Sequence, residues 1–425
     1  MKNNQKICVI GLGYVGFPLA ILCSIKGYEV FGYDKDEKKL ARIEKGENIV
    51  EEKYLDEILP KAKINIIRDE SQMKDCDIFI IAVPTPVDEK YYPDLSYVIS
   101  ASETVAKNMK KGALVVVEST INPGVCEEFV RPAFEKAGFI VGEDVFISHC
   151  PERINPGDSK WNVTNIPRVV GSFEKKGLEM SVKFYKSIID AEILPMKSIR
   201  EAEAVKIMEN SFRDINIAFV NELAKSFNLM DIDVVNVIRG AATKPFAFMP
   251  HWPSCGVGGH CIPVDPYYLI EKAKENDFDH KFLRVARAIN NSMPEYSVEL
   301  LQDELNNLGK SLKGARVGLL GVSYKADVGD LRESPALKII GLLKKHGAEL
   351  FIFDPYISKL SNVGGVDELL GKSEVIFLAT SHGEFKKIPA EKFKENGIGV
   401  IIDGMNCLDK EKIQSLGIVY KGIGR

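Results

Sequence analysis

The chain has few features that would bind a metal ion or cross-link a secreted fold. Its eight cysteines are spread over 425 residues with no Cys-x-x-Cys pair, which argues against a disulfide framework and against a zinc site. Its six histidines show no His-x-x-x-His spacing. We therefore expect reduced thiols, a cytoplasmic location and no bound metal.

The chain also lacks an excess of basic charge and long apolar runs. The net charge of −4 does not support a nucleic-acid footprint, which requires a basic domain. No uninterrupted apolar run is long enough to cross a bilayer, and the first residues contain no secretory hydrophobic segment. We expect neither nucleic acid nor a membrane as a partner. The length predicts roughly two or three domains.

The first 34 residues hold a pattern typical of dinucleotide binding. The apolar run Lys6–Ile10 leads into the glycine turn GLGYVG at 11–16, then into a helix, and then into a second strand, Glu29–Tyr33. A lone GxGxxG is weak evidence, but strand, turn, helix, strand and terminal acid together form the full fingerprint. The acid is Asp34, directly after the second strand.

Each residue of this fingerprint has a physical task. Gly11 allows the tight turn, Gly13 lets the backbone approach a pyrophosphate, and Gly16 permits close packing of the helix on the strand. The helix N-terminus then faces the phosphates. Asp34 would accept hydrogen bonds from ribose hydroxyls, and its charge disfavours a 2′-phosphate, so the sequence predicts NAD as the cofactor and not NADP.

Two separate stretches of the chain show alternating strand and helix signals, which is typical of doubly wound α/β units. We predict an α/β protein with two Rossmann-like doubly wound domains, joined by a central helical dimerisation region. The boundaries that we predict are residues 1–195, 196–310 and 311–425. The first domain should contain strands at 64–67, 77–83, 113–117, 145–148 and 167–171 and a helix at 175–188, and the last should begin with a strand at 315–321.

Polar side chains follow several predicted strands. Thr85, Thr120, Glu152 and Arg153 all come directly after strands, and ligands of open α/β sheets bind beyond the carboxyl ends of strands. The two threonines could therefore meet the cofactor, although Thr also simply closes strands. Glu152 and Arg153 are equally compatible with a solvated ion pair.

The middle of the chain is predicted to form long helices. Ser198–Lys225 has no glycine or proline and shows apolar residues at helical spacing, which suits a central spine or a dimer contact. Lys206, Asn210 and Arg213 share one face close to this apolar stripe, where a binding role competes with ordinary solvent-facing polarity. A second long helix is predicted over Lys281–Leu308. The apolar stripe that we expect consists of Ala204, Ile207, Met208, Phe212, Ile215, Ala218 and Phe219.

A glycine-rich loop with one cysteine, GVGGHCIPVDPYY at 256–268, lies between helical stretches. Glycines let the backbone approach a ligand, a proline stiffens the exit, and Asp265 is one turn beyond Cys261, so the thiol is a candidate nucleophile. The alternative is a small buried cysteine without a role. Lys325 and Arg332, after the first strand of the last domain, suit phosphates or are plain surface charges.

A nucleophilic thiol beside an NAD fold suggests more than alcohol oxidation. The thiol can add to an aldehyde, and the thiohemiacetal can lose a second hydride to become a thioester that water cleaves. One site would then convert a primary alcohol to a carboxylate with two NAD. A two-electron dehydrogenase of an alcohol or hydroxy acid, indifferent to thiol alkylation, is the simpler alternative.

Seven ordered motifs give the whole chain a resemblance to the UDP-sugar 6-dehydrogenases, the nucleotide-sugar dehydrogenase family. The motifs are GLGYVG at 11–16, VPTP at 83–86, ESTINPG at 118–124, PERINPGD at 151–158, EAVKIMENSFRDINIAFVNE at 203–222, GVGGHCIPVDPYY at 256–268 and SYKADVGDLRESPA at 323–336. The resemblance implies an NAD-dependent enzyme that acts on a UDP-sugar and forms a homodimer or a higher homo-oligomer through its central helices.

The resemblance also implies a role for each matching residue. As catalytic residues it implies Cys261 (the nucleophile), Lys206, Asn210, Asp265, Glu152 and Thr120. As NAD contacts it implies Gly11, Gly13, Tyr14, Val15, Gly16, Asp34, Thr85, Thr120 and, from a neighbouring subunit, Arg332. As UDP-sugar contacts it implies Arg153, Ile154, Lys206, Asn210, Arg213, Gly258, Tyr324 and Lys325.

The sugar is the open question. The run KPFAFMP at 244–250 together with HCIPVDP at 260–266 is similar to the branch that oxidises UDP-N-acetylglucosamine for surface polysaccharide. UDP-N-acetylmannosamine and UDP-glucose enzymes are the alternatives. Met405 falls where relatives usually carry a basic residue, which would weaken phosphate binding or alter the sugar. A non-catalytic regulator that binds NAD or a UDP-sugar is the alternative of a different class.

Overall fold

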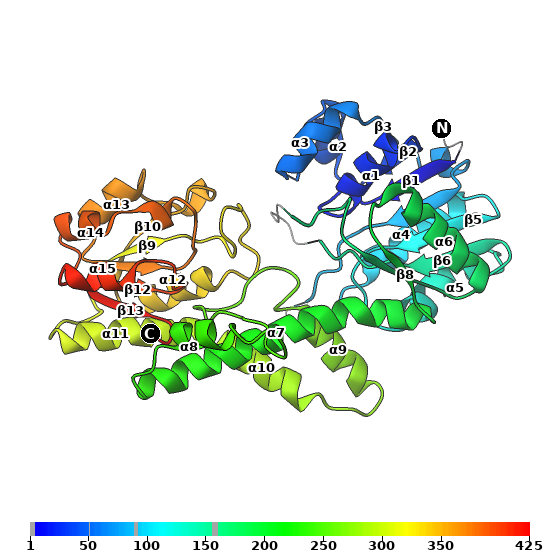
Figure 1. Ribbon diagram of the computed structural model, residues 1–425. Coiled ribbons are helices and arrows are strands. Elements are labelled where there is room, and N and C mark those ends of the chain that lie inside the picture. Colours follow the sequence, from blue (N-terminus) through cyan, green and yellow to red (C-terminus); the bar gives the residue numbers. More distant parts are fainter. Residues whose placement is uncertain (1–4, 51, 89–91, 155–159) are drawn as a thin grey trace. The chain divides into compact units, whose positions relative to one another are not determined.

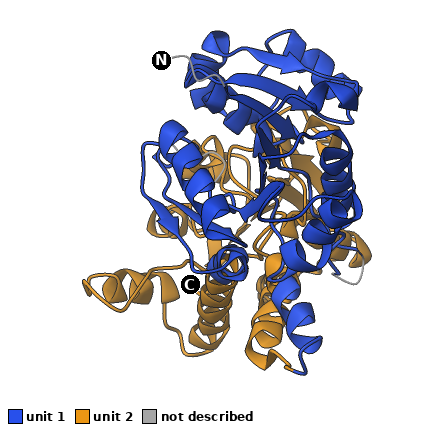
Figure 2. Cartoon of the chain, turned by 90° about the vertical axis from the view of Figure 1, so that its right-hand side faces the viewer, with its two compact units in different colours: residues 1–209, 267–277 blue, residues 210–266, 278–425 orange. Residues whose placement is uncertain are grey.

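The computed structural model describes residues 5–50, 52–88, 92–154 and 160–425 (Figure 1). The chain forms two compact units, one of residues 1–209 with 267–277 and the other of residues 210–266 with 278–425 (Figure 2). The α/β fold class is confirmed, because each unit is built on a largely parallel sheet. The division into three domains at 195 and 310 stays a prediction.

Unit 1 contains an eight-stranded sheet in the order β3-β2-β1-β4-β5-β6-β7-β8. All neighbouring strands are parallel except β6 and β7, which are antiparallel. The order 3-2-1-4-5-6 is that of a doubly wound dinucleotide fold, whose ligand crevice lies where the order reverses. The strands are β1 (Lys6–Ile10), β2 (Glu29–Tyr33), β3 (Ile64–Ile66), β4 (Ile78–Ile81), β5 (Ala113–Val117), β6 (Val145–His149), β7 (Arg168–Ser172) and β8 (Ile193–Pro195).

Alternation along these strands builds two cores, one on each face of the sheet. In β1, Ile7 and Val9 join one cluster of buried side chains, and Cys8 and Ile10 join the other. Continuous apolar runs of this kind are expected for parallel strands that are covered on both faces. The covering helices are α1 (Gly16–Ile25), α2 (Glu37–Glu44), α3 (Lys53–Ile58), α4 (Ser96–Asn108), α5 (Arg131–Lys136) and α6 (Lys175–Ile188).

Unit 2 contains a five-stranded, fully parallel sheet in the order β10-β9-β11-β12-β13. Its two faces are again covered by separate apolar cores. The strands are β9 (Arg316–Leu320), β10 (Glu349–Phe353), β11 (Val375–Leu378), β12 (Val400–Asp403) and β13 (Val419–Gly422). The helices of this sheet are α12 (Pro335–Lys345), α13 (Val366–Lys372), α14 (Ala390–Glu395) and α15 (Lys410–Ser415).

The central helices are α7 (Ile199–Leu229), α8 (Val234–Ala241), α9 (Asp265–Lys274), α10 (Lys281–Asn291) and α11 (Met293–Asn307). The prediction of one helix over Lys281–Leu308 is wrong, because the chain ends α10 at Asn291 and restarts at Met293. Pro294 stands in the first turn of α11, where its missing N–H is tolerated, and it could not continue α10. Nowhere in the described ranges is a helix both long and apolar enough to span a membrane.

Helix α7 differs from its prediction in one respect. The large side chains of the predicted apolar stripe are not core residues of the chain: Met208 is 71% exposed, and Phe212 and Phe219 are about half exposed. Buried positions lie on another side of the helix and include Asn210, Asp214 and Asn221. Of the predicted stripe, Ile207 and Ala218 are buried within the chain, and only the large side chains of Met208, Phe212 and Phe219 are left exposed.

Candidate active site

The glycine turn after β1 has the geometry of a phosphate cradle. Gly11 adopts a φ of +89°, and a Cβ there would lie 2.6 Å from the carbonyl oxygen of Ala82. A Cβ on Gly13 would meet no atom within 4 Å, so the backbone is open on that side. Helix α1 has neither a side-chain cap nor an acidic residue in its first turn, so no side chain competes with an anion at its N-terminus. These residues fit the pyrophosphate of NAD, and Tyr14 and Val15 lie within the same turn.

Asp34 sits at the end of β2, beside this turn. Its carboxylate accepts hydrogen bonds from the amide of Leu12 at 2.8 Å, the amide of Asp36 at 3.0 Å and the ammonium of Lys39 at 2.6 Å. Partial burial raises the pKa of Asp34, but the hydrogen bonds from Lys39, Asp36 and Leu12 outweigh it and lower the pKa below its usual value. The side chain stays charged, and it can only accept hydrogen bonds, as a ribose diol requires.

We predict that Asp34→Ser shifts the cofactor preference towards NADP. The change removes the acceptor for ribose hydroxyls and frees the Lys39 ammonium, now 2.6 Å from Asp34, for a 2′-phosphate. The ratio of kcat/KM with NADP to that with NAD should rise by on the order of 10-fold. Steady-state kinetics with both cofactors measures it. The double variant Asp34→Ser/Lys39→Ala should lose the gain, and an equal gain in both variants would contradict this role of Lys39.

The strand-end residues of unit 1 lie at the edge that the sequence predicts. Thr85 and Thr120 are half-buried, and the Thr85 carbonyl accepts a hydrogen bond from the Tyr268 hydroxyl. Glu152 is buried, and its Oε1 accepts the amides of Arg153 at 2.6 Å and Ile154 at 2.8 Å. The predicted motif at 151–158 continues into residues 155–158, which lie outside the described residues.

Glu152 belongs to a buried charge cluster. The fully buried guanidinium of Arg168 lies 2.6 Å from the Glu152 carboxylate and 3.5 Å from that of Glu118. Glu118 also accepts a hydrogen bond from the Tyr185 hydroxyl. Burial raises the pKa of Glu118 to about 7, against the attraction of Arg168. One cation thus holds two carboxylates, and the Glu152 side chain has a fixed orientation.

The predicted contacts Arg153 and Lys206 occupy different environments. Arg153 forms an ion pair with Glu209 and donates to the Pro167 carbonyl at 3.1 Å, so its guanidinium is already engaged. Lys206 is half-buried on α7. The start of that helix is tied to the loop after β5, because the buried carboxylate of Glu203 accepts the amides of Gly124 and Cys126.

In unit 2, the glycine–cysteine loop is anchored to a buried acid–amide pair. The carbonyl of Cys261 accepts the amide of Asp265 at 2.8 Å, and the carboxylate of Asp265 accepts a hydrogen bond from the Asn210 side-chain amide. Asn210 and Asp265 are buried, whereas Cys261 is half-buried. Cys261 and Cys407 are the two cysteines of the chain that are not fully buried, so Cys261 is no core cysteine.

The same loop packs against the segment that follows β9. A Cβ on Gly258 would lie 2.6 Å from the Tyr324 Cβ, and one on Gly259 would lie 2.8 Å from the Tyr324 ring. The Gly259 amide also donates to the Arg332 carbonyl at 2.9 Å. A side chain at position 258 or 259 would collide with Tyr324, which explains why both residues are glycine. Within unit 2 the predicted UDP-sugar contact Tyr324 therefore lies directly against the cysteine loop.

The remaining predicted residues lie near solvent. The Arg332 guanidinium pairs with the Asp330 carboxylate at 2.6 Å; Lys325 is half-buried and Arg213 is exposed. Met405 stands where the resemblance implies a basic residue. Its side chain packs against both cores of the unit 2 sheet, so this position has apolar surroundings. No group of three or more His, Cys, Asp or Glu side chains in the described parts of the chain could hold a metal ion.

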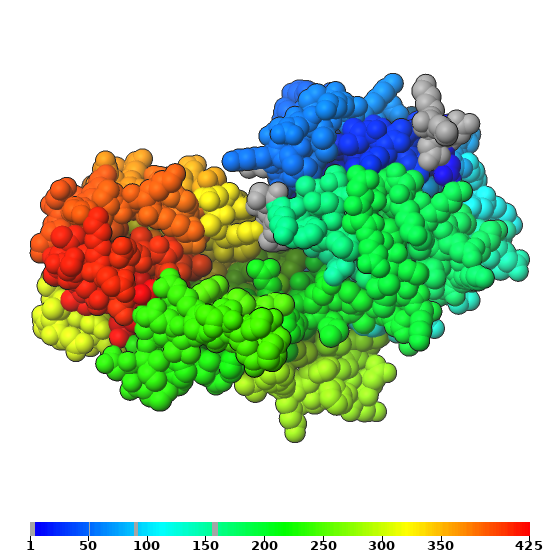
Figure 3. Space-filling view, in the orientation of Figure 1, coloured from blue at the N-terminus to red at the C-terminus, as the bar shows by residue number. Residues whose placement is uncertain are grey.

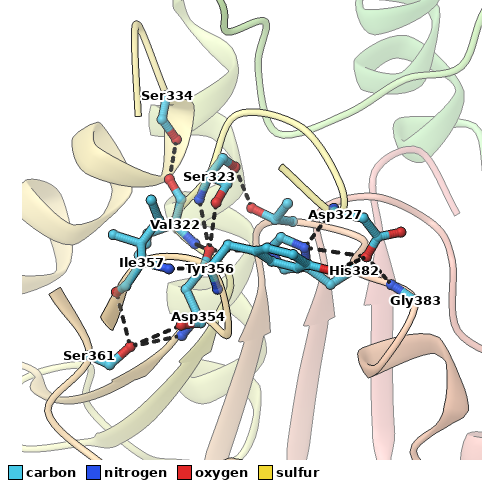
Figure 4. A network of polar contacts seen from close by, with 11 residues as sticks. Val322, Ser323, Asp327, Ser334, Asp354, Tyr356, Ile357, Ser361, His382 and Gly383 are labelled. Atoms are coloured by element: carbon cyan, nitrogen blue, oxygen red, sulfur yellow. Dashed lines mark hydrogen bonds and ion pairs between the residues drawn. The ribbon is translucent and has the colours of Figure 1, made fainter. Parts of the chain in front are cut away.

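Sequence reasoning missed several residues that hold the site. Arg168, Glu118 and Tyr185 brace Glu152. His382 and Asp354 form a buried network that also holds Ser323, the residue before Tyr324 (Figure 4). The available signal was a charge within an apolar strand, since Arg168 stands at the start of β7 between apolar residues. Charged residues are almost never fully buried unless they are paired.

Known proteins resemble the chain over its full length. Three models of the UDP-glucose/GDP-mannose dehydrogenase family match it: the NAD binding domain at residues 5–189, the central domain at 200–292 and the UDP binding domain at 318–410. A UDP-N-acetyl-D-mannosamine dehydrogenase of Pyrococcus horikoshii is 36% identical over 99% of both chains. A UDP-N-acetyl-D-glucosamine 6-dehydrogenase of Pseudomonas aeruginosa is 37% identical over 96% of this chain and 99% of the other. The solved structure of the UDP-D-ManNAc dehydrogenase from P. horikoshii superposes with a TM-score of 0.92 at 35% identity, covering 99% of both chains.

Proposed function

The chain belongs to the UDP-glucose/GDP-mannose dehydrogenase family, and on that premise we propose that it oxidises the 6-hydroxymethyl group of UDP-N-acetylglucosamine to the carboxylate with two NAD. Family membership confirms the predicted enzyme class and cofactor. The observation that carries the covalent mechanism is the anchoring of the Cys261 turn to the buried pair of Asp265 and Asn210; the choice of sugar rests on the runs at 244–250 and 260–266. A rigid, half-exposed thiol is what covalent catalysis needs.

The reaction that we propose runs in balanced steps. NAD, when bound, accepts a hydride from C6. The alcohol loses a hydride and a proton to give the aldehyde. The Cys261 thiolate adds to the aldehyde carbon, and the resulting oxyanion takes up a proton to give the thiohemiacetal. The thiohemiacetal loses a hydride, for which a second NAD would be the acceptor, and a proton to give a thioester. Water then cleaves the C–S bond, which releases the carboxylate and returns the thiol.

The chain's own residues divide these tasks. We propose that Lys206 stabilises the oxyanion or accepts the proton that leaves the C6 oxygen, since a lysine can serve either purpose. We assign Glu152 and Thr120 to the surroundings of the hydrolytic water and the nicotinamide, and Asp265 with Asn210 to orienting the turn that carries Cys261. Glu152 suits this task because the Arg168 guanidinium pairs with one oxygen of its carboxylate and so fixes the orientation of the side chain.

A panel of UDP-sugars tests this function. UDP-N-acetylglucosamine should give two NADH per sugar, measured by absorbance against the amount of uronate formed. UDP-N-acetylmannosamine is the second candidate, because the P. horikoshii enzyme named for that sugar superposes at 0.92. UDP-glucose and UDP-galactose complete the panel. One NADH per sugar would indicate a two-electron dehydrogenase, and no turnover with any UDP-hexosamine would contradict the sugar class.

We also propose that the protein works as a homodimer or a higher homo-oligomer in the cytoplasm. The support is the exposed apolar side chains of α7 and α10. They are Met208, Phe212 and Phe219 on α7 and Phe282 and Val285 on α10, and the α10 segment reaches the molecular surface (Figure 3, yellow-green). Contiguous exposed apolar side chains mark interaction surfaces. A light-scattering mass equal to one chain of 47.3 kDa at assay concentration would contradict the oligomer.

A further inference from the structure

The segment between β9 and α12, residues 323–334, is named here the substrate loop because it carries the proposed UDP-sugar contacts Tyr324 and Lys325. It contains no regular helix or strand. Asp327 and Glu333 adopt left-handed backbone conformations, with φ of +60° and +48°. Such conformations are unfavourable for residues other than glycine and persist where the surroundings enforce them. The loop position is therefore set by the contacts that hold it.

The two ends of the substrate loop are held by several redundant contacts. At the start, the Asp354 carboxylate accepts the amides of Val322 at 2.7 Å and Ser323 at 2.9 Å, and the Ser323 hydroxyl at 2.9 Å. At the end, the Ser334 hydroxyl donates to the Val322 carbonyl at 2.7 Å. Loss of one of these bonds leaves the others in place.

The middle of the loop is held through His382. The amide of Asp327 donates to His382 Nδ1 at 2.8 Å, and His382 Nε2 lies 3.1 Å from Asp354 Oδ2 (Figure 4). The imidazole is fully buried; the ring of Tyr356 lies 5.0 Å from it and that of Phe385 5.2 Å. Because Nδ1 must accept from an amide, the hydrogen-bond network assigns the proton to Nε2, which donates to Asp354.

The two contacts of the imidazole are not equally replaceable. Asp354 has five further donors, three at Oδ2 and two at Oδ1, the latter being the amides of Tyr356 at 2.8 Å and Ile357 at 3.1 Å. The Asp327 carboxylate accepts the amide of Gly383 at 2.9 Å and the hydroxyl of Tyr356 at 3.4 Å. The Asp327 backbone amide, in contrast, donates to Nδ1 in a partly buried bond. Losing that acceptor would loosen the backbone in the middle of the loop, because only the side-chain contacts of Asp327 would remain.

We propose that His382 is a positioning residue for UDP-sugar binding, acting through its Nδ1 on the Asp327 amide and so on Tyr324 and Lys325. Tyr324 in turn packs on the backbone of Gly259, two residues before Cys261. The inference rests on the proposed function, since it assumes that the substrate loop contacts UDP.

Two amide variants, each of which reproduces the position of one ring nitrogen, separate this role from simple core packing. His382→Asn places its side-chain oxygen where Nδ1 was and keeps the acceptor for Asp327. His382→Gln reaches the Nε2 position and keeps the donor to Asp354 but offers no acceptor at Nδ1. With the Gln variant we expect the KM for the UDP-sugar and the Kd for UDP, measured by titration calorimetry, to rise on the order of 10-fold, with kcat and the KM for NAD changed by less than about threefold. The Asn variant should remain within about threefold of wild type in all four values.

Hydrogen–deuterium exchange gives a readout that does not depend on turnover. Peptides covering residues 323–334 should exchange faster in His382→Gln than in wild type, and His382→Asn should match wild type. Equal losses in both variants would overturn the inference and indicate a packing role. If the wild-type protein binds no UDP, the proposed function is contradicted. If the wild type binds UDP and the two variants behave alike, only the role of His382 is contradicted.

Discussion

Replacing Cys261 with alanine is expected to abolish the conversion of alcohol to carboxylate. The second oxidation requires a covalent adduct on the thiol, so uronate formation should fall by on the order of 10⁴-fold. The NADH yield should fall from two per sugar to at most one, because the first hydride transfer needs no nucleophile. Mass spectrometry of the uronate and absorbance of NADH measure the two quantities separately.

Cys407→Ala is the matched control for this variant. Cys407 is the other cysteine that is not fully buried, and burial together with the charge of Asp403 raises the pKa of its thiol. The Cys407 backbone amide donates a hydrogen bond to the Asp403 carboxylate at 2.8 Å, and alanine keeps this donor. This variant should retain wild-type turnover. Full uronate formation by Cys261→Ala, or no loss of activity on complete alkylation of Cys261, would sink the covalent mechanism.

Replacing Gly16 with alanine is expected to disrupt the fold of unit 1. A Cβ at this position would lie 1.9 Å from the carbonyl oxygen of Gly11 and 3.1 Å from a methyl group of Val9. The first neighbour is backbone of the phosphate turn and cannot rotate away. We expect a loss of at least about 3 kcal/mol in the free energy of unfolding, seen as a lower midpoint of thermal unfolding, together with loss of NAD binding.

Gly13→Ala should separate stability from binding. Its Cβ would meet no protein atom within 4 Å, so the unfolding midpoint should stay near wild type, within about 0.5 kcal/mol. The methyl group would stand where the backbone must approach the pyrophosphate, and the Kd for NAD should rise by on the order of 10-fold or more. Wild-type NAD affinity in Gly13→Ala would contradict the location of the phosphate cradle.

Residues with a local signature could be predicted from the sequence. The glycine turn at 11–16, with Asp34 closing the next strand, predicts a doubly wound sheet because the spacing alone sets strand, turn and helix. Strands such as Glu29–Tyr33 and Ala113–Val117 have the predicted bounds. The weakly apolar β8 and β13, of three and four residues, have no comparable signal and were not predicted.

Contacts between distant segments could not be predicted in the same way. His382 touches Asp327 and Asp354 across 55 and 28 residues of chain, and no periodicity marks such a meeting. Arg168 is visible in the sequence as a charge at the start of an apolar strand, but its partners Glu118 and Glu152 are known only once the sheet brings them beside it. The exposed side chains Met208, Phe212 and Phe219 of α7 belong to a stripe with the spacing of a core-facing one. The spacing alone does not tell whether an apolar face is covered by the same chain or by another one.

The burial of Asp354 bears on how many dinucleotides one chain can bind. The turns after β1 and β9 are alike: Gly11 and Gly321 have φ of +89° and +88°, and each acid, Asp34 or Asp354, accepts the amide that follows its glycine. The Asp34 side chain keeps 11% of its surface exposed, whereas that of Asp354 is fully enclosed and satisfied by its own unit. In the second sheet, the acid at the position of Asp34 is therefore enclosed, and its carboxylate is occupied by hydrogen bonds within unit 2. Each chain should hold one dinucleotide, and the second sheet is free to serve the other substrate.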